Sequence, residues 1–207
     1  LIREELFLAR QYFELERQGG IQPDFQRECY RALFEKKIPL KAHVHRCDDI
    51  FTAIRIAQEF DLRLTLDHCT EGHLIAHQIA QSGFPAIVGP SLASRSKIEV
   101  EQSDFKTAGI LDKAGVLVAL TTDHPVSRIQ YLPLCAALAV KEGMGEEAAL
   151  RAITINAARI CQVDGKTGSL KEGKDADLVI LDGNPLHIGT RVRLTLINGK
   201  IVYSASN

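Results

Sequence analysis

Histidine and aspartate side chains stand where short apolar runs of this sequence end. His43 and His45 follow one such run, His68 follows the next, and Asp123 with His124 follows a later one. Imidazole nitrogens and carboxylate oxygens are the ligands that zinc and similar divalent metals take from proteins. Taken singly, each of these residues is more often structural, but together they predict a metal centre.

The elements that position these residues alternate between strand and helix. Apolar runs predict strands, and stretches with a period of 3.6 residues predict the helices around them. The predicted strands are 38–43, 62–67, 84–88 and 116–120, and the predicted helices are 1–17, 24–36, one that begins at Asp48 or Asp49, 71–82, 105–114, 129–143 and 146–158. Such alternation indicates an α/β fold with a parallel sheet, either doubly wound or half of a (β/α)8 barrel. Reactive groups in these folds share the rim at the carboxyl ends of the strands.

Side-chain alternation bears on the choice between His43 and His45. Residues two apart in a strand point to the same face, so both imidazoles face the same side. His43 is nearer the strand and is the better ligand candidate, whereas His45 lies in the loop and could face substrate. His73 and His77 have the i, i+4 spacing that can bind a metal. No glutamate accompanies them as in H-E-x-x-H, so we interpret them as ordinary helix residues.

The tail changes character at Gly165. Two alternating stretches and an Asn198-Gly199 hairpin signal of type I′ predict a small antiparallel module. Its predicted strands are 176–181, 191–197 and 200–203. A hairpin and one strand cannot bury a core alone, so this module needs partner strands. The predicted division is therefore 1–164 for the strand–helix unit and 165–207 for the β module.

Composition excludes several classes of function. The formal net charge is -1, from 25 basic and 26 acidic residues, with no basic stripe for nucleic acid or anionic lipid. No apolar stretch is long enough to span a membrane. The five cysteines form no C-x-x-C pair, which favours reduced thiols in a cytoplasmic protein. Cys47 and Cys69 lie close to the histidines, so a cysteine nucleophile is a minor alternative.

Three strand-end segments and the tail together resemble the amidohydrolase superfamily, close to its imidazolonepropionase-like and prolidase-like branch. The resemblance runs from about residue 38 to the end of the chain. The resembling segments are Leu40-Lys41-Ala42-His43-Val44-His45-Arg46 with Asp48-Asp49-Ile50, Leu66-Asp67-His68, Leu120-Thr121-Thr122-Asp123-His124-Pro125, Asn156-Ala157-Ala158-Arg159, and Gly168-Ser169-Leu170-Lys171-Glu172-Gly173-Lys174-Asp175-Ala176-Asp177-Leu178-Val179. The tail is the most specific part.

The resemblance implies the C-terminal half of a (β/α)8 TIM barrel, strands 5–8, with the C-terminal part of a composite β-sandwich. His43 then corresponds to the metal ligand of strand five and His68 to that of strand six. Asp123 corresponds to the carboxylate of strand eight, which binds metal and accepts a proton from the attacking water. The implied reaction is hydrolysis of a C–N bond in a small amide, lactam or cyclic amidine, with zinc as the metal and iron or manganese as alternatives.

The substrate would meet His45, Arg46 and His124, and the loop 91–103 would shape its pocket. The family's first-strand H-x-H pair and its strand-four bridging residue have no counterpart here. We therefore expect a fragment that is inactive alone and that self-associates through exposed apolar edges. The alternative is a non-catalytic binding or scaffold module. A Rossmann-like nucleotide-binding domain is disfavoured, since neither G-x-G-x-x-G nor a Walker pattern follows a strand.

Overall fold

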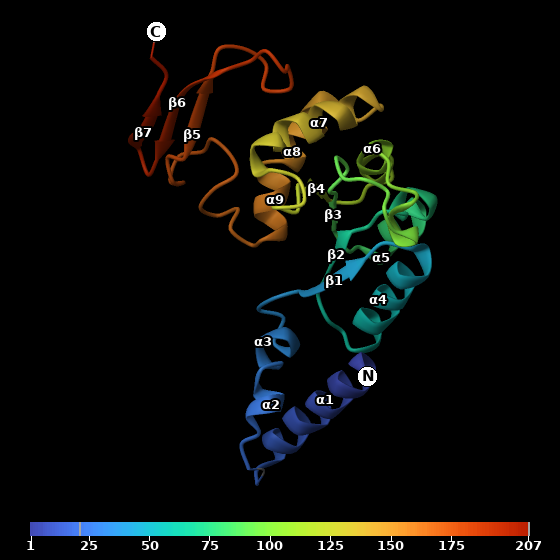
Figure 1. Cartoon of the computed structure of the whole chain (residues 1–207). Helices are drawn as coiled ribbons and strands as arrows, with labels where there is room; N and C mark the ends of the chain where they lie inside the picture. Colours follow the sequence, from blue (N-terminus) through green and yellow to red (C-terminus); the bar gives the residue numbers. More distant parts are fainter. Residues whose placement is uncertain (21, 207) are drawn as a thin grey trace.

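A four-stranded parallel sheet forms the centre of the computed structural model, which describes residues 1–20 and 22–206 (Figure 1). The strands lie in the order β1-β2-β3-β4. Their bounds are Leu40–Val44 for β1, Leu64–His68 for β2, Ala86–Val88 for β3 and Val118–Leu120 for β4. Val44 pairs with His68, His68 with Val88, and Val88 with Leu120. The four strands therefore end in register and form one strand-end rim, as predicted for an α/β parallel sheet.

Helices connect these strands and bury one side of the sheet. α4 (Cys47–Glu59), α5 (Ala76–Ser82) and α6 (Lys106–Lys113) lie between successive strands, and α7 (Leu132–Lys141), α8 (Glu146–Ala152) and α9 (Ile155–Ile160) follow β4. Ile50, Leu66 and Val118 are fully buried in the core that they share, and burial of such apolar surface drives the packing. Lys41 and His43 of β1 point to the other face and are exposed.

The N-terminal segment departs from one prediction. α1 (Ile2–Gln18) forms as expected, but the helix predicted over 24–36 is two short ones, α2 (Phe25–Glu28) and α3 (Arg31–Phe34). Asp24 caps α2 and accepts from two backbone N–H groups. The Tyr12 hydroxyl donates to Glu28 at 2.6 Å, and Arg31 donates to Glu16 at 2.8 Å. These contacts hold the two short helices against α1, so tertiary structure overrides local helix propensity.

Three other predicted helices are interrupted or begin differently. Residues 71–82 begin with a 3₁₀ turn, Gly72–Leu74, before α5, and residues 129–143 begin with another, Ile129–Tyr131, before α7. Residues 146–158 divide into α8 and α9 around Thr154, whose hydroxyl donates to the carbonyl of Leu150 at 2.7 Å. Such a side-chain bond competes with the helical ladder. His73 and His77 consequently lie in different elements and do not share one helix face.

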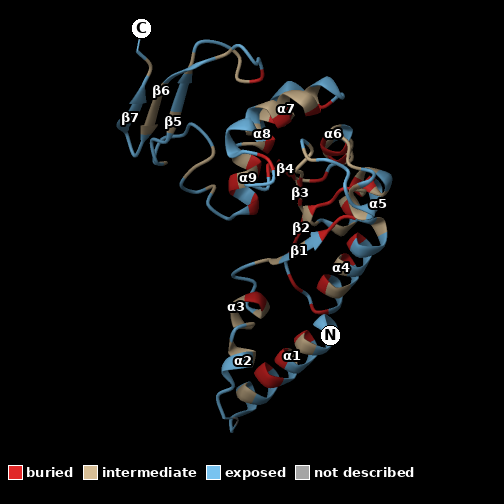
Figure 2. Cartoon of the chain, in the orientation of Figure 1, coloured by how far each residue is buried: buried red, intermediate tan, exposed pale blue. Residues whose placement is uncertain are grey.

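The tail forms a separate antiparallel sheet, in the order β5-β6-β7. Its strands are Leu178–Leu181, Val192–Ile197 and Lys200–Ser204. Asn198 and Gly199 have φ values of 49° and 74°, so the predicted type I′ turn is confirmed. Figure 2 shows the strands of this sheet exposed or half-buried, whereas most residues of the central sheet are buried. Among the described residues, no helix is long and apolar enough to cross a membrane.

Candidate functional site

Three imidazoles gather at the strand-end rim. The ring centroids of His43 and His68 are 4.3 Å apart, those of His43 and His45 are 4.8 Å apart, and those of His45 and His68 are 5.0 Å apart. His43 belongs to β1, His45 follows it by two residues, and His68 ends the neighbouring strand β2. The parallel register thus brings together side chains that are distant in sequence, as the positions at the strand ends predicted.

The ring of His68 is fixed by a backbone carbonyl. Its Nδ1 donates to the carbonyl oxygen of Gly89 at 2.7 Å. Because a carbonyl can only accept, Nδ1 carries the proton and Nε2 of the neutral ring keeps its lone pair. Metal-binding histidines in proteins are commonly oriented in this way, by a hydrogen bond from the ring nitrogen that does not bind the metal. The geometry therefore leaves His68 Nε2 suited to a ligand role.

Gly89 occupies a backbone position that only glycine tolerates easily. Its φ is +127°, and a Cβ atom added there would collide with the carbonyl oxygen of Thr121. Thr121 in turn donates its backbone N–H to Val88 at 2.9 Å, at the end of β3. The carbonyl that orients His68 thus lies directly after β3, beside the backbone that follows β4.

Backbone strain marks two of the predicted site residues. His68 and Asp123 have φ values of 71° and 49°, in the left-handed region that non-glycine residues rarely adopt. Such conformations persist where the surrounding structure enforces them, and they concentrate at functional sites. The strain agrees with a functional role for both positions.

His45 is buried, whereas His43 is exposed. The Nδ1 of His45 lies 2.7 Å from the hydroxyl oxygen of Thr70, and its Nε2 lies 3.0 Å from Nε2 of His43. Burial lowers the pKa of His45, and the neighbouring His68 and His43 rings lower it further. The sequence assigned no role to Thr70, because nothing local shows that it meets a residue 25 positions earlier.

A charged pair lies beside the imidazoles. The carboxylate of Asp67 pairs with Lys41 Nζ at 2.8 Å and accepts from the Thr65 hydroxyl at 3.1 Å. Asp67 is the register partner of His43 in the parallel ladder. Sequence reasoning missed this pair, although the alternation that linked His43 to His45 also places Lys41 on the same face. A lysine and a carboxylate to which the sequence analysis gave no role thus lie next to His43 in the sheet.

The structure does not bring Asp123 into contact with the histidines. Asp123 and His124 are exposed in the turn after β4, and the Asp123 backbone N–H donates to the Thr121 hydroxyl at 3.0 Å. Its carboxylate forms no hydrogen bond or ion pair with any residue that the structure describes. Arg46 is also exposed and pairs with Asp48 at 3.2 Å. The roles predicted for Asp123, Arg46 and His124 stay predictions.

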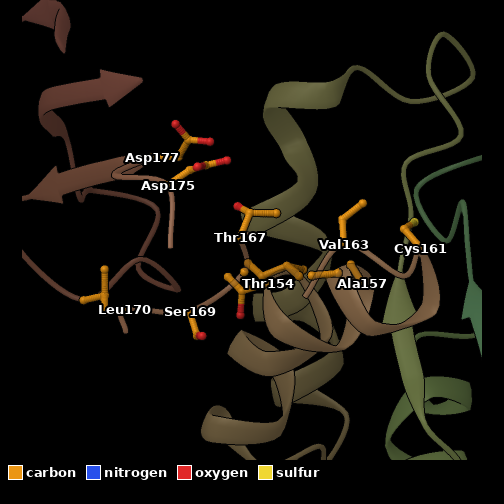
Figure 3. Close-up of a pocket in the computed structure, with 12 residues that line it drawn as sticks. Thr154, Ala157, Cys161, Val163, Thr167, Ser169, Leu170, Asp175 and Asp177 are labelled. Atoms are coloured by element: carbon orange, nitrogen blue, oxygen red, sulfur yellow. The ribbon is translucent and has the colours of Figure 1, made fainter. Parts of the chain in front are cut away.

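The cavity beside His68 is small. It is lined by His68, Thr70 and both ends of the loop 91–103, and its volume is about 10 Å³, room for a single water molecule. A larger cavity of about 620 Å³ lies between α9 and the segment leading to β5 (Figure 3). Asp175 and Asp177 line it on the side of the β module, and none of the predicted site residues does. A substrate pocket for the imidazoles is thus not enclosed by the described residues.

The cysteines are not arranged as nucleophiles. All five thiols are free. Burial raises the pKa of Cys47 to about 11, with Glu71 adding to the shift, and burial raises that of Cys69 to about 12. A thiol is nucleophilic as its thiolate, which both residues therefore lack near neutral pH. The minor alternative of a cysteine nucleophile loses its physical basis.

The chemistry of the imidazoles fits a borderline divalent metal in part. Nε2 of His68 is oriented by Gly89, and Nε2 of His43 faces the same rim. Within residues 1–20 and 22–206, however, no group of three or more His, Cys, Asp or Glu side chains is arranged to hold a metal ion. Structural and catalytic zinc sites use three or four protein ligands. The described residues therefore do not form a complete zinc site.

Fold and site together define an α/β protein with a histidine-rich rim at the carboxyl ends of its parallel strands. The model of the family described as "Amidohydrolase family" matches residues 8–203. That span is most of the chain, so the chain belongs to the amidohydrolase family, and the resemblance seen in the motifs is confirmed.

Individual relatives agree with this assignment. The chain is 36% identical over 109 residues to an imidazolonepropionase of Picrophilus torridus, covering 48% of this chain and 28% of the relative. It is 28% identical over 182 residues to an N-substituted formamide deformylase of Arthrobacter pascens, covering 75% and 33%. A solved amidohydrolase of Thermotoga maritima MSB8 is 36% identical, with a TM-score of 0.93 over 99% of this chain and 55% of its own. The chain thus spans about half of that structure and a third or less of the two curated relatives.

Proposed function

We propose that the full-length protein hydrolyses C–N bonds in small amides, lactams or cyclic amidines with the help of a divalent metal. Family membership and the oriented ring of His68 carry the proposal. Two relatives are named for an imidazolone and for an N-substituted formamide, and both compounds contain such a bond.

In this proposal His43 and His68 hold the metal through Nε2, and Asp123 completes the set from this chain. Zinc suits these ligands best, with iron or manganese as alternatives. The metal supplies a Lewis acid that polarises the substrate carbonyl and makes water a better nucleophile. Asp123 accepts the proton of the attacking water and passes it to the leaving nitrogen.

Three further residues contact the substrate in this proposal. His45 lies beside His43 and faces the carbonyl group, and His124 follows Asp123 in the same turn. Arg46 would bind an anionic part of the substrate by exchanging its present partner Asp48. Both ends of the loop 91–103 already line the cavity next to His68, which favours the loop as a wall of the pocket.

The proposed architecture is strands 5–8 of a (β/α)8 barrel over residues 1–164 and part of a composite β-sandwich over residues 165–207. The accessible surface supports an incomplete unit. It is 12455 Å², whereas a compact monomer of 22.8 kDa exposes about 9,600 Å², so the excess is roughly 2,900 Å². A standard interface buries about 800 Å² per partner. We therefore propose that the isolated chain is inactive and self-associates. The five free thiols support the further proposal that the protein resides in the cytoplasm.

Hydrolysis assays of the full-length protein test the function. Metal is removed and then titrated back in the presence of an N-substituted formamide, a lactam and an imidazolone. Asp123→Asn should lower turnover by about 10²-fold or more, whereas His77→Asn, at an exposed site on α5, should leave it unchanged. Undiminished turnover in Asp123→Asn would eliminate the proposed proton transfer.

A non-catalytic binding or scaffold module is the second candidate. The observation that favours it is the separation of the Asp123 carboxylate from the imidazoles in the described chain. The same assays decide between the two candidates, because a binding module turns over none of these substrates at any metal concentration.

A further inference from the structure

We propose that two copies of the 207-residue chain pair edge to edge, with β1 of each copy alongside β4 of the other, and close one parallel barrel. In this assembly the imidazoles of each copy lie one strand away from the Asp123 turn of its partner. The pairing follows from the edges of the sheet. The use of the shared groups to bind a metal rests on the proposed function.

Both edge strands of the central sheet turn main-chain groups outward. After β4, the N–H of Thr121 donates to the carbonyl of Val88 on β3. Successive residues of a strand bond to opposite sides, so the main-chain groups of Val118 and Leu120 point away from β3. A row of such groups is a template for pairing with another strand.

The edge at β1 has the complementary arrangement. The carbonyl of Val44 accepts from the N–H of Cys69, which directly follows β2. By the same alternation, the main-chain groups of Lys41 and His43 point away from β2. Because all four strands of the sheet are parallel, β1 of a second copy can continue the sheet beyond β4 in the same direction.

A buried amide at the β4 edge lacks a partner. Nδ2 of Asn156 donates at 3.0 Å to the carbonyl of Val118, one of the groups that point away from β3. Asn156 is 6% exposed, and its Oδ1 is the only buried side-chain nitrogen or oxygen without a hydrogen bond among the described residues. Buried acceptors are normally satisfied, which indicates that an N–H donor from a further strand belongs at this edge.

The amount and the placement of open surface favour a second copy as that partner. The chain exposes roughly 2,900 Å² more than a compact monomer of its mass, whereas a standard interface takes about 800 Å² from each partner. Two-fold symmetry brings β1 of each copy to β4 of the other, so both copies lose both open edges. Four strands from each copy make eight, a number at which a small barrel closes around its side chains.

Closure of the barrel changes the neighbours of Asp123. Within one chain β4 lies three strands from β1, a backbone separation of about 14 Å. Across the junction the same two strands are adjacent, at about 5 Å. The exposed Asp123 turn of one copy then lies beside His43 and His45 of the other. Each junction thus brings together imidazole and carboxylate groups that a single copy holds apart.

Sedimentation equilibrium of Lys41→Pro and Lys41→Ala tests the pairing. Proline removes an N–H that points to the open edge, where a sheet tolerates it, and alanine keeps that N–H. Both variants lose the ion pair with Asp67, so they differ in the main chain. Lys41→Pro should weaken self-association about tenfold or more, because each junction loses a hydrogen bond, and Lys41→Ala should associate like the wild type. Equal association of the two variants overturns the pairing.

Hydrogen exchange of the wild type gives an answer that does not depend on the folding of a variant. The amides of Val118 and Leu120 should exchange more slowly at high than at low protein concentration, because only the associated chain pairs them. The amide of Thr121 is already bonded to β3 and serves as the internal control. Exchange at Val118 and Leu120 that is independent of concentration overturns the proposal.

Mixed variants locate the shared ligands. His43→Asn and Asp123→Asn chains are unfolded together in urea, refolded and titrated with Co²⁺ followed by absorption, beside each variant alone and the wild type taken through the same cycle. Each mixed dimer keeps one junction with both His43 and Asp123, and half of the dimers are mixed, so the mixture should show about a quarter of the wild-type sites. Each variant alone keeps no such junction.

The outcomes separate this proposal from the proposed function. A mixture that binds no more Co²⁺ than the separate variants overturns the shared site. A wild type that associates but binds no Co²⁺ overturns the shared site together with the metal role in the proposed function. The strand pairing is decided independently, by the sedimentation of the Lys41 variants.

Discussion

Gly89→Ala is the substitution whose effect the structure defines best. A non-glycine residue held in a rare backbone conformation costs about 1–3 kcal/mol. The added Cβ also collides with the Thr121 carbonyl, and forcing extra atoms into a packed site costs about 1–3 kcal/mol more. The expected loss of unfolding free energy is therefore about 2–6 kcal/mol. Domains of this kind are stable by about 5–15 kcal/mol, so the loss is a large share of the total.

Gly83→Ala is the matched control. Gly83 also has a positive φ, +73°, but nothing lies within 4 Å of an added Cβ, so only the left-handed strain of about 1–2 kcal/mol applies. Urea unfolding of both variants, followed by circular dichroism, should show the larger loss for Gly89→Ala by at least about 1 kcal/mol. Equal losses would mean that the contact with Thr121 does not constrain this turn.

The same substitution should disturb His68. The Gly89 carbonyl orients this ring, and loss of such an orienting partner weakens metal binding about 10–100-fold. Co²⁺ titration followed by absorption measures the change in affinity in the full-length protein. Gly83→Ala should keep the wild-type affinity, since Gly83 lies at the end of α5 and nothing lies within 4 Å of an added Cβ.

Three further changes have defined outcomes. Cys47 should react slowly with iodoacetamide at pH 8 and about tenfold faster per pH unit as the pH rises toward its pKa of about 11, because only the thiolate attacks. Asn156→Ala should lower the free energy of unfolding in urea by about 1–3 kcal/mol, since its buried amide donates to the Val118 carbonyl at 3.0 Å. Ile180→Lys should reduce self-association in sedimentation equilibrium, because this apolar side chain of β5 is 50% exposed.

Each of these outcomes has its own control. Cys29 is exposed and should label rapidly at pH 8, so equal rates for Cys47 and Cys29 contradict the effect of burial. An Asn156→Ala variant as stable as wild type would show that the bond to the sheet contributes nothing. If Ile180→Lys associates as strongly as the wild type, the exposed side chain of Ile180 does not lie in the contact between chains.

The sequence predicted the strands well because each is a short apolar run in a buried parallel sheet. The run predicted over 62–67 is the strand Leu64–His68, and the one predicted over 116–120 is Val118–Leu120. Helix continuity was predicted less well. The helix over 24–36 is broken by contacts of Glu28 and Arg31 with α1, and no local pattern encodes such contacts.

In the candidate site, too, local patterns predicted some features and tertiary contacts set the others. The strand ends and side-chain alternation were enough to place His43, His45 and His68 together. The groups that orient these rings could not be predicted, because Thr70 and the Gly89 carbonyl reach them from other strand ends. Such partners are set by register and turn geometry, which a one-dimensional pattern does not contain.

Whether the Asp123 carboxylate reaches the imidazoles depends on the curvature of the sheet. The contacts among the imidazoles do not depend on it. His43 and His68 lie on adjacent strands, whereas β4 is two strands away from β2, a backbone separation of about 10 Å at the strand spacing of a sheet. Side chains on strands so far apart converge only if the sheet curves toward a closed barrel. In this chain β1 and β4 are both open edges. The proposed hydrolysis therefore requires further strands that close the sheet and supply the remaining ligands, while the ring of His68 is already oriented by the Gly89 carbonyl.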